Sequence, residues 1–134
     1  MSYFNWDAKR FNLDIKEMDR EHQKIVSIMN ELFEANAKGE PKAMLMRLLN
    51  DLVTVTTTHF SDEERFMASF GYEGLESHKQ IHKNLLNELT IHLGRYRAGG
   101  DRVPDEIFTF LRFWLSAHIT GIDKQYAKVA KSSA

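Results

Sequence analysis

The chain has 134 residues, about the size of one domain, so we expect a single domain over residues 1–134. Hydrophobic residues make up 43% and charged residues 28%, the balance of a soluble globular protein. The formal net charge of -1 argues against a general attraction to nucleic acid or to anionic lipid. Cysteine is absent, which excludes disulfides, thiol nucleophiles and sulfur-ligated metals. Any metal must therefore be held by nitrogen and oxygen ligands.

The N-terminal dozen residues contain charged side chains and no apolar run, so no signal peptide is predicted. No stretch approaches the ~20 apolar residues that are needed to span a bilayer. We therefore expect a cytoplasmic protein that has no membrane partner.

An N-terminal arm, residues 1–17, precedes the first predicted helix. That helix is expected over about 18–38, where apolar side chains recur at spacings of three and four. Gly39 suits a helix end, and Pro41 suits the first turn of the next helix. The sequence therefore predicts that the first helix ends near Gly39 and that the second begins almost at once.

The second predicted helix runs from about 41 to 70 and includes a β-branched run, residues 53–58, that weakly opposes it. Glycine turns border the third helix, Pro104 begins the fourth, and residues 128–134 are predicted as a polar tail. Short connections between amphipathic helices favour antiparallel neighbours. The fold class predicted is all-α, an up-down-up-down four-helix bundle over about 18–127 with the N-terminal arm.

Five of the six histidines lie on the apolar stripes of these helices, and every helix supplies at least one. A single interior histidine is commonly satisfied by one hydrogen bond. Burying five imidazoles and a carboxylate would cost roughly 1–3 kcal/mol for each group left unpaired. A bound metal is the simpler explanation for the set, which is His22, His59, His78, His82 and His118.

Two spacings place candidate ligands on one helix face. His59 and Glu63 are four residues apart, as are His78 and His82, and a step of four residues passes a full helical turn by only about 40°. Two such pairs on apolar stripes in adjacent helices are much more specific than either pair alone.

The last candidate pair does not fit a regular α-helix. His118 and Asp123 are five residues apart, which leaves them about 140° out of line. Gly121 lies between them and would permit a local distortion, of which a π-bulge is one form. An exposed charge near the terminus is the alternative interpretation of Asp123.

Seven ligands are too many for one first-row ion. Two octahedral ions offer about twelve positions, and five imidazoles, two bridging carboxylates and a bridging oxide or hydroxide would leave one of them open. Nitrogen and carboxylate ligands suit iron, manganese or zinc, and helical bundles of this kind favour iron. A site rich in neutral imidazole favours reversible binding of a small molecule over vigorous oxygen activation.

Four motifs of this chain resemble those of the hemerythrin family, and the match spans roughly residues 6–126. All seven ligand positions of the family pattern are filled by the expected residue type. The motifs are Asp19-Arg20-Glu21-His22, His59-Phe60 with Glu63-Glu64, Ser77-His78 with His82, and Trp114-Leu115 with His118-Ile119 and Asp123.

The resemblance implies a non-haem, oxo-bridged di-iron centre, with Fe2+/Fe3+ ions and a bridging oxide or hydroxide, that binds dioxygen reversibly. By this resemblance, one iron is held by three histidines, His78, His82 and His118. The iron with the vacancy is held by His22 and His59, and the carboxylates of Glu63 and Asp123 bridge the two irons. The dioxygen pocket that it implies is lined by Ile25, Phe60, Trp114, Leu115 and Ile119, with Met67 and Tyr126 packed nearby.

Two polar residues are excluded from the predicted ligand set. His92 lies about 15 Å beyond His82 along the same helix, and Glu64 points about 100° away from Glu63. Glu64 is interpreted as solvated and His92 as a surface or flanking residue. Replacing His92 also serves as a test of the assignment, because both irons should then be retained.

The leading hypothesis is a dioxygen-binding protein for carriage, storage or local supply. A di-iron enzyme is disfavoured because no proton relay stands out near His22. A sensor of oxygen, redox state or nitric oxide would need a separate signalling or oxygen-consuming partner, and histidines that are structural or hold zinc are the remaining alternative. A monomer is expected.

Overall fold

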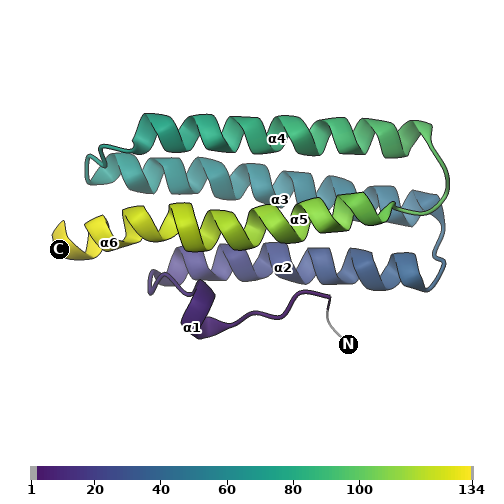
Figure 1. The fold of residues 1–134 in the computed structure, drawn as a ribbon, viewed down its shortest axis with the longest axis horizontal. Coiled ribbons are helices and arrows are strands. Elements are labelled where there is room, and N and C mark those ends of the chain that lie inside the picture. The colour runs from purple at the N-terminus through teal and green to yellow at the C-terminus, as the bar shows by residue number, and fades with distance from the viewer. Residues whose placement is uncertain (1–2, 134) are drawn as a thin grey trace.

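The computed structural model describes the backbone of residues 3–133 and the side chains of residues 3–131. In Figure 1, three long helices and a fourth composite rod lie side by side with alternating direction. The predicted all-α, up-down-up-down four-helix bundle is confirmed. The elements are α1 (Ala8–Phe11), α2 (Lys16–Ala37), α3 (Lys42–Ser69), α4 (Leu75–Ala98), α5 (Asp105–Ala117), η1 (His118–Asp123) and α6 (Lys124–Ser133).

The turns between the helices lie where glycine and proline predicted them. Gly39 and Gly71 have φ values of 76° and 64°, in the left-handed region that glycine enters without steric penalty. The β-branched run stays helical because Thr56 is buried and Val53 and Val55 pack against the core, and packing outweighs weak helix propensity. The exposed hydroxyls of Thr54 and Thr57 donate to Asn50 O at 3.0 Å and Val53 O at 2.7 Å.

Both ends of the chain differ from the prediction. Residues 1–2 lie outside the described part, and the rest of the predicted arm contains α1 and ends at Ile15 because α2 begins at Lys16. The predicted polar tail, 128–134, is helical as far as Ser133, with residue 134 outside the described part. That segment continues a helix whose start is anchored by the buried side chains of Tyr126 and Ala127, which local composition does not reveal.

Hydrogen bonds to α2 hold the N-terminal arm against the bundle. The backbone N–H of Phe4 donates to Asn30 Oδ1 at 2.7 Å, and Asn30 Nδ2 donates back to Phe4 O at 2.9 Å. The carboxylate of Asp19 accepts from the N–H groups of Leu13 and Asp14 at 2.7 and 3.0 Å. The arm therefore has a fixed position on the bundle.

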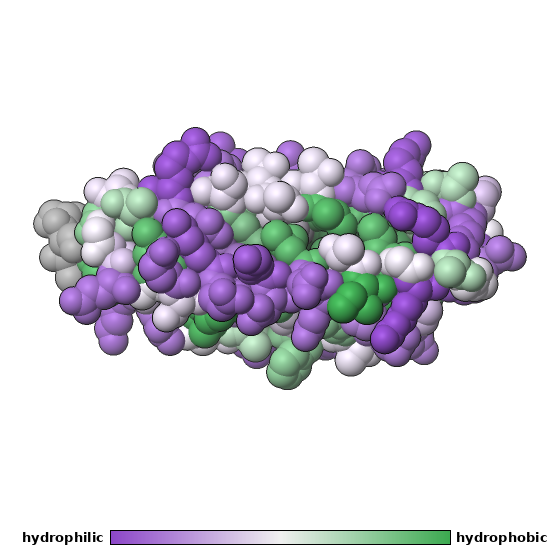
Figure 2. Space-filling view, turned by 90° about the horizontal axis from the view of Figure 1, so that it is seen from above, coloured by the Kyte–Doolittle hydropathy of each residue, from purple (hydrophilic) through white to green (hydrophobic). Residues whose placement is uncertain are grey.

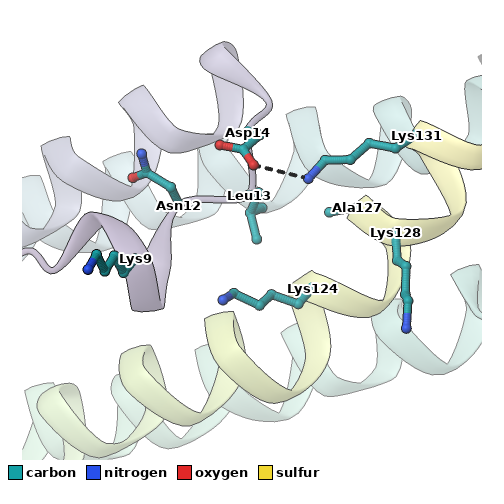
Figure 3. A pocket seen from close by; sticks show the side chains of 8 residues that line it. All are labelled: Lys9, Asn12, Leu13, Asp14, Lys124, Ala127, Lys128 and Lys131. Carbon is teal, nitrogen blue, oxygen red and sulfur yellow. Dashed lines mark hydrogen bonds and ion pairs between the residues drawn. The ribbon is translucent and has the colours of Figure 1, made fainter.

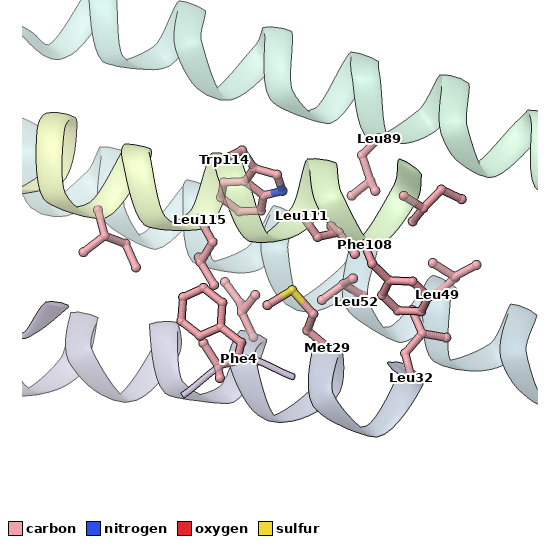
Figure 4. Packing of buried hydrophobic residues seen from close by; sticks show 14 of the residues in the cluster. Phe4, Met29, Leu32, Leu49, Leu52, Leu89, Phe108, Leu111, Trp114 and Leu115 are labelled. Atoms are coloured by element: carbon pink, nitrogen blue, oxygen red, sulfur yellow. The ribbon is translucent and has the colours of Figure 1, made fainter. Parts of the chain in front are cut away.

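The hydrophobic core fills the interior with side chains from every long helix (Figure 4). On the face seen in Figure 2, hydrophilic side chains predominate and hydrophobic ones appear in smaller areas between them. No helix among residues 3–133 is both long enough and apolar enough to cross a membrane. The buried residues labelled in Figure 4 are Phe4, Met29, Leu32, Leu49, Leu52, Leu89, Phe108, Leu111, Trp114 and Leu115.

The start of α3 is fixed to the end of α4 by one ammonium group. Lys42 Nζ donates to the carbonyl oxygens of Tyr96, Gly99 and Gly100 at 2.9, 3.0 and 2.9 Å, and it lies 4.7 Å from the centre of the Tyr96 ring. These carbonyls lie at the C-terminal end of α4, which carries the negative end of the helix dipole, and the Tyr96 oxygen also accepts the N–H of Gly99 at 3.0 Å.

We expect Lys42→Met to lower the free energy of unfolding by about 1–2 kcal/mol, because the helix end loses a charged donor. Urea titration followed by circular dichroism measures this loss. Lys38→Met is the control, since Lys38 makes only an exposed ion pair with Glu34 and should cost less than ~0.5 kcal/mol. Equal losses in the two variants would show that the capping contact contributes nothing specific.

Candidate metal centre

The seven predicted ligands lie together in the interior of the bundle. Every one of them is buried, with exposures between 0% and 5%, although all seven are polar or ionisable. The helix α2 supplies His22, and α3 supplies His59 and Glu63. His78 and His82 come from α4, and His118 and Asp123 come from η1.

A π-helical turn brings the last two of these residues into line. η1 covers His118–Asp123, and its hydrogen bonds close over five residues rather than four. Residues five apart therefore stack on one face, and Asp123 is 0% exposed. The distortion that the spacing required is present, so the alternative of an exposed charge at Asp123 is wrong.

The candidate ligand atoms form two groups that share both carboxylates. Within each group, one atom from every residue lies within 4.8 Å of one atom from every other. The first group contains three histidines, His78, His82 and His118, together with Glu63 and Asp123. The second contains two histidines, His22 and His59, together with the same two carboxylates.

Asp123 directs one oxygen to each group. Its Oδ1 lies 3.1 Å from His78 Nε2 and 3.0 Å from His118 Nε2, whereas its Oδ2 lies 3.1 Å from His22 Nε2. A carboxylate that presents its two oxygens to two ligand sets could serve an ion in each set.

Glu63 repeats the pattern from α3. Its Oε1 lies 2.9 Å from His82 Nε2 and 3.2 Å from His78 Nε2, and its Oε2 lies 3.3 Å from His59 Nε2. The hydroxyl of Tyr126 also donates to Oε2 at 2.7 Å. Two carboxylates from different helices therefore join the same two groups.

Several of these atoms are close to one another but make no hydrogen bond. They are buried, and buried polar atoms in proteins almost always have partners. A cation between the converging nitrogen and oxygen atoms would satisfy them all, so the residues fit a metal centre. The atoms are Nε2 of His22, His59 and His82, Oε1 of Glu63, and both carboxylate oxygens of Asp123.

Two further glutamates hold histidines from outside the cluster. Glu21 Oε1 lies 2.6 Å from His59 Nδ1, and Glu64 Oε2 lies 2.8 Å from His82 Nδ1. A proton held on Nδ1 leaves the Nε2 lone pair free for a metal, and such partners orient metal-binding imidazoles. The interpretation of Glu64 as simply solvated is therefore wrong, and sequence reasoning gave Glu21 no role.

Burial and charge act in opposite directions on the ionisable groups of the cluster. Burial by itself would lower the pKa of His59, but the Glu21 and Glu63 carboxylates raise it to about 10. Burial would likewise lower the pKa of His118, but the Asp123 carboxylate outweighs this effect and the pKa of His118 rises to about 9. Burial opposes ionisation of Glu63, yet the four histidines that surround its carboxylate hold its pKa well below the usual range. Metal uptake must therefore displace protons.

Tyr126 keeps its proton in this setting. Burial raises the pKa of its hydroxyl, and the negative charges of Glu63 and Asp123 raise it further. The phenol therefore acts as a neutral donor to Glu63.

Apolar and aromatic side chains cover the cluster. The Phe60 ring stacks on His82 with centroids 3.7 Å apart and planes at 4°, and the Trp114 ring lies 5.8 Å from Phe60 and 6.1 Å from His118. All five predicted pocket residues are buried: Ile25, Phe60, Trp114, Leu115 and Ile119. His92 belongs to neither ligand group and packs 4.9 Å from Phe110.

Comparison with known proteins agrees with this geometry. The profile of the Hemerythrin HHE cation binding domain matches residues 13–130. The chain belongs to the hemerythrin family. It is 32% identical over 133 residues to the bacteriohemerythrin of Pseudomonas aeruginosa, covering 99% of this chain and 85% of that relative. It is 33% identical to the myohemerythrin of Riftia pachyptila, covering 93% and 92%.

A solved structure of a wild-type hemerythrin shares the fold of this chain. The two superpose with a TM-score of 0.86 at 28% sequence identity, and the match covers 95% of this chain and 97% of the hemerythrin chain. Fold and sequence thus place the chain in the same family.

We expect Glu64→Gln to weaken metal binding about tenfold or more, because a neutral amide holds the His82 ring less firmly than a carboxylate. Anaerobic competition for Fe2+ against a chromophoric chelator measures the affinity. Glu73→Gln removes the same charge from an exposed turn residue and should leave the affinity unchanged. If both variants bind Fe2+ as tightly as the parent, Glu64 does not position His82.

Proposed function

We propose that this protein binds dioxygen reversibly at a non-haem di-iron centre and serves in oxygen carriage, storage or local supply. The observation that carries the proposal is that the two ligand groups share two carboxylates, those of Glu63 and Asp123. When bound, two iron ions with a bridging oxide or hydroxide would supply the redox-active pair to which dioxygen adds.

The two groups are unequal, and this inequality supports a binding role. One group offers three imidazoles and the other two, His22 and His59. With the same bridges serving both groups, the second has one protein ligand fewer. It therefore has room for an external ligand, in agreement with the open position that the ligand count predicts.

The surrounding side chains favour binding over turnover. Phe60 and Trp114 lie against the imidazoles, and Ile25 is one helical turn beyond His22 and is 1% exposed. Such a wall excludes water and the protons that it would deliver. The Tyr126 hydroxyl that donates to Glu63 is itself held protonated by burial and by the nearby negative charges.

The relatives support the same proposal. Proteins named bacteriohemerythrin and myohemerythrin match nearly the whole chain. The monomeric state, the cytoplasmic location and any signalling or oxygen-consuming partner stay predictions.

The proposal is tested by anaerobic optical titration of the iron-loaded protein with dioxygen, followed by removal of the gas. We expect an absorption band that appears with dioxygen and disappears over repeated cycles without loss of amplitude. Steady consumption of dioxygen and reductant would identify an enzyme instead. A band that decays irreversibly in the first cycle would also overturn reversible binding.

The ligand assignment is tested separately by iron analysis of purified variants. His59→Ala removes one of the two histidines of the smaller group and should retain about one iron per chain, whereas His92→Ala should retain about two. Circular dichroism establishes that both variants are folded. Equal iron contents in the two variants would contradict the assignment, and zinc in place of iron in the parent protein would overturn the di-iron centre.

A further inference from the structure

One buried hydroxyl near the metal centre has no hydrogen-bond partner among the described residues. It belongs to Thr56, which is 1% exposed and is not one of the candidate ligands. Two other threonines of the same run, Thr54 and Thr57, are exposed and donate to carbonyl oxygens one turn earlier in α3, as helical threonines commonly do. A buried polar group without a partner is costly and uncommon in native proteins, so a use for the Thr56 hydroxyl is expected.

Thr56 lies on the side of the cluster where the pocket for an external ligand is expected. It precedes His59 by three residues on α3, and side chains at this spacing are neighbours on one helix face. Ile25, a pocket residue, follows His22 by three residues on α2. Because α2 and α3 run in opposite directions (Figure 1), Thr56 and Ile25 lie on the same side of the smaller ligand group.

Phe60 connects Thr56 with the rest of the pocket wall. It follows Thr56 by four residues, and its ring lies 5.8 Å from that of Trp114. The Trp114 indole nitrogen also lacks a partner among the described residues. Figure 4 shows this nitrogen on the Leu111 side of the ring, whereas His118 follows Trp114 in the other direction. The Thr56 hydroxyl is therefore the better placed donor for a ligand at the metal centre.

The wall around Thr56 is closed to water. Thr56, Ile25 and Phe60 are at most 2% exposed. The cleft between the arm and α6, shown in Figure 3, is lined by none of the wall residues. A hydrogen bond in such an interior is electrostatically stronger than one at the surface, so a single hydroxyl can have a measurable effect on a bound ligand.

We propose that Thr56 Oγ1 donates a hydrogen bond to the outer atom of the external ligand at the smaller ligand group, and so favours negatively charged ligands of two or three atoms. The inference rests on the proposed function, because it requires the open position beside His22 and His59. Their neighbour Thr56 has its Cβ about 5–6 Å from that of His59. A ligand of one atom would not span the gap from a metal to the hydroxyl, whereas a longer one extends toward it.

The chemistry of the hydroxyl agrees with reversible binding. Threonine offers one O–H donor, and an aliphatic alcohol does not release its proton in neutral water. The contact therefore stabilises negative charge on the ligand without protonating it. The apolar wall and the Thr56 hydroxyl act together, since the wall excludes other proton donors.

The test compares two anions on the oxidised, iron-loaded full chain by optical titration. Azide has three atoms in line, and fluoride has one. Thr56→Val keeps the shape of the side chain and removes the hydroxyl. Azide should bind about tenfold or more weakly, because a hydrogen bond to a charged group is lost, and fluoride should bind within about twofold of the parent. The infrared stretching band of bound azide should also shift.

Two further variants and one further measurement separate this contact from a structural role. Thr56→Ser retains the hydroxyl and should bind azide as the parent does, and Thr57→Val makes the same chemical change at an exposed position and should leave both affinities unchanged. Urea titration of the metal-free Thr56→Val protein should give a midpoint equal to or above that of the parent, because no hydrogen bond is lost there. A lower midpoint would show that the hydroxyl has a structural partner and would overturn the inference.

Two results with the anions would also overturn it. Equal azide affinity in the parent and in Thr56→Val would show that the hydroxyl does not reach the ligand, and equal losses for azide and fluoride would show that the substitution disturbs the irons themselves. Azide binds without dioxygen, so a failure of reversible dioxygen binding leaves this test intact. Absence of iron from the parent would overturn the proposed function and this inference with it.

Discussion

The burial of two carboxylates between the same five imidazoles is the constraint on which the rest of the structure depends. Glu63 and Asp123 are fully buried, and an isolated buried charge would be severely destabilising. Their four oxygens can be compensated only if histidines from α2, α3, α4 and η1 reach the same space. This requirement fixes the register of all four rods of the bundle, because each rod must bring its own ligands to the same level.

One local distortion reconciles this requirement with helical geometry. The π-turn of η1 places Asp123 on the face of His118, and the chain then continues as α6 with its phase altered. That change of phase brings the Tyr126 hydroxyl to Glu63 on α3. A regular α-helix through the same residues would direct Asp123 away from the other carboxylate, so the distortion serves both the cluster and its covering hydroxyl.

The sequence predicted the features that helical spacing and turn residues encode, and it missed contacts between particular side chains on different helices. His59 with Glu63, and His78 with His82, follow from helical spacing, and the antiparallel bundle follows from the turns. The roles of Glu21 and Glu64 depend on contacts between helices, which no periodicity encodes. The helical state of residues 128–133 was missed because its composition is polar, while the anchoring contacts lie just before it at Tyr126 and Ala127.

The arm reaches the metal centre through one aromatic side chain. The Trp6 ring lies 6.3 Å from the ring of His22, a residue of the smaller ligand group, and its indole N–H donates to Asn12 Oδ1 at 2.7 Å. On either side of Trp6 the arm is attached to α2, by the hydrogen bonds between Phe4 and Asn30 and by those from Leu13 and Asp14 to Asp19. The segment that covers His22 is therefore held at both of its ends, so the smaller ligand group is enclosed by the arm as well as by the long helices.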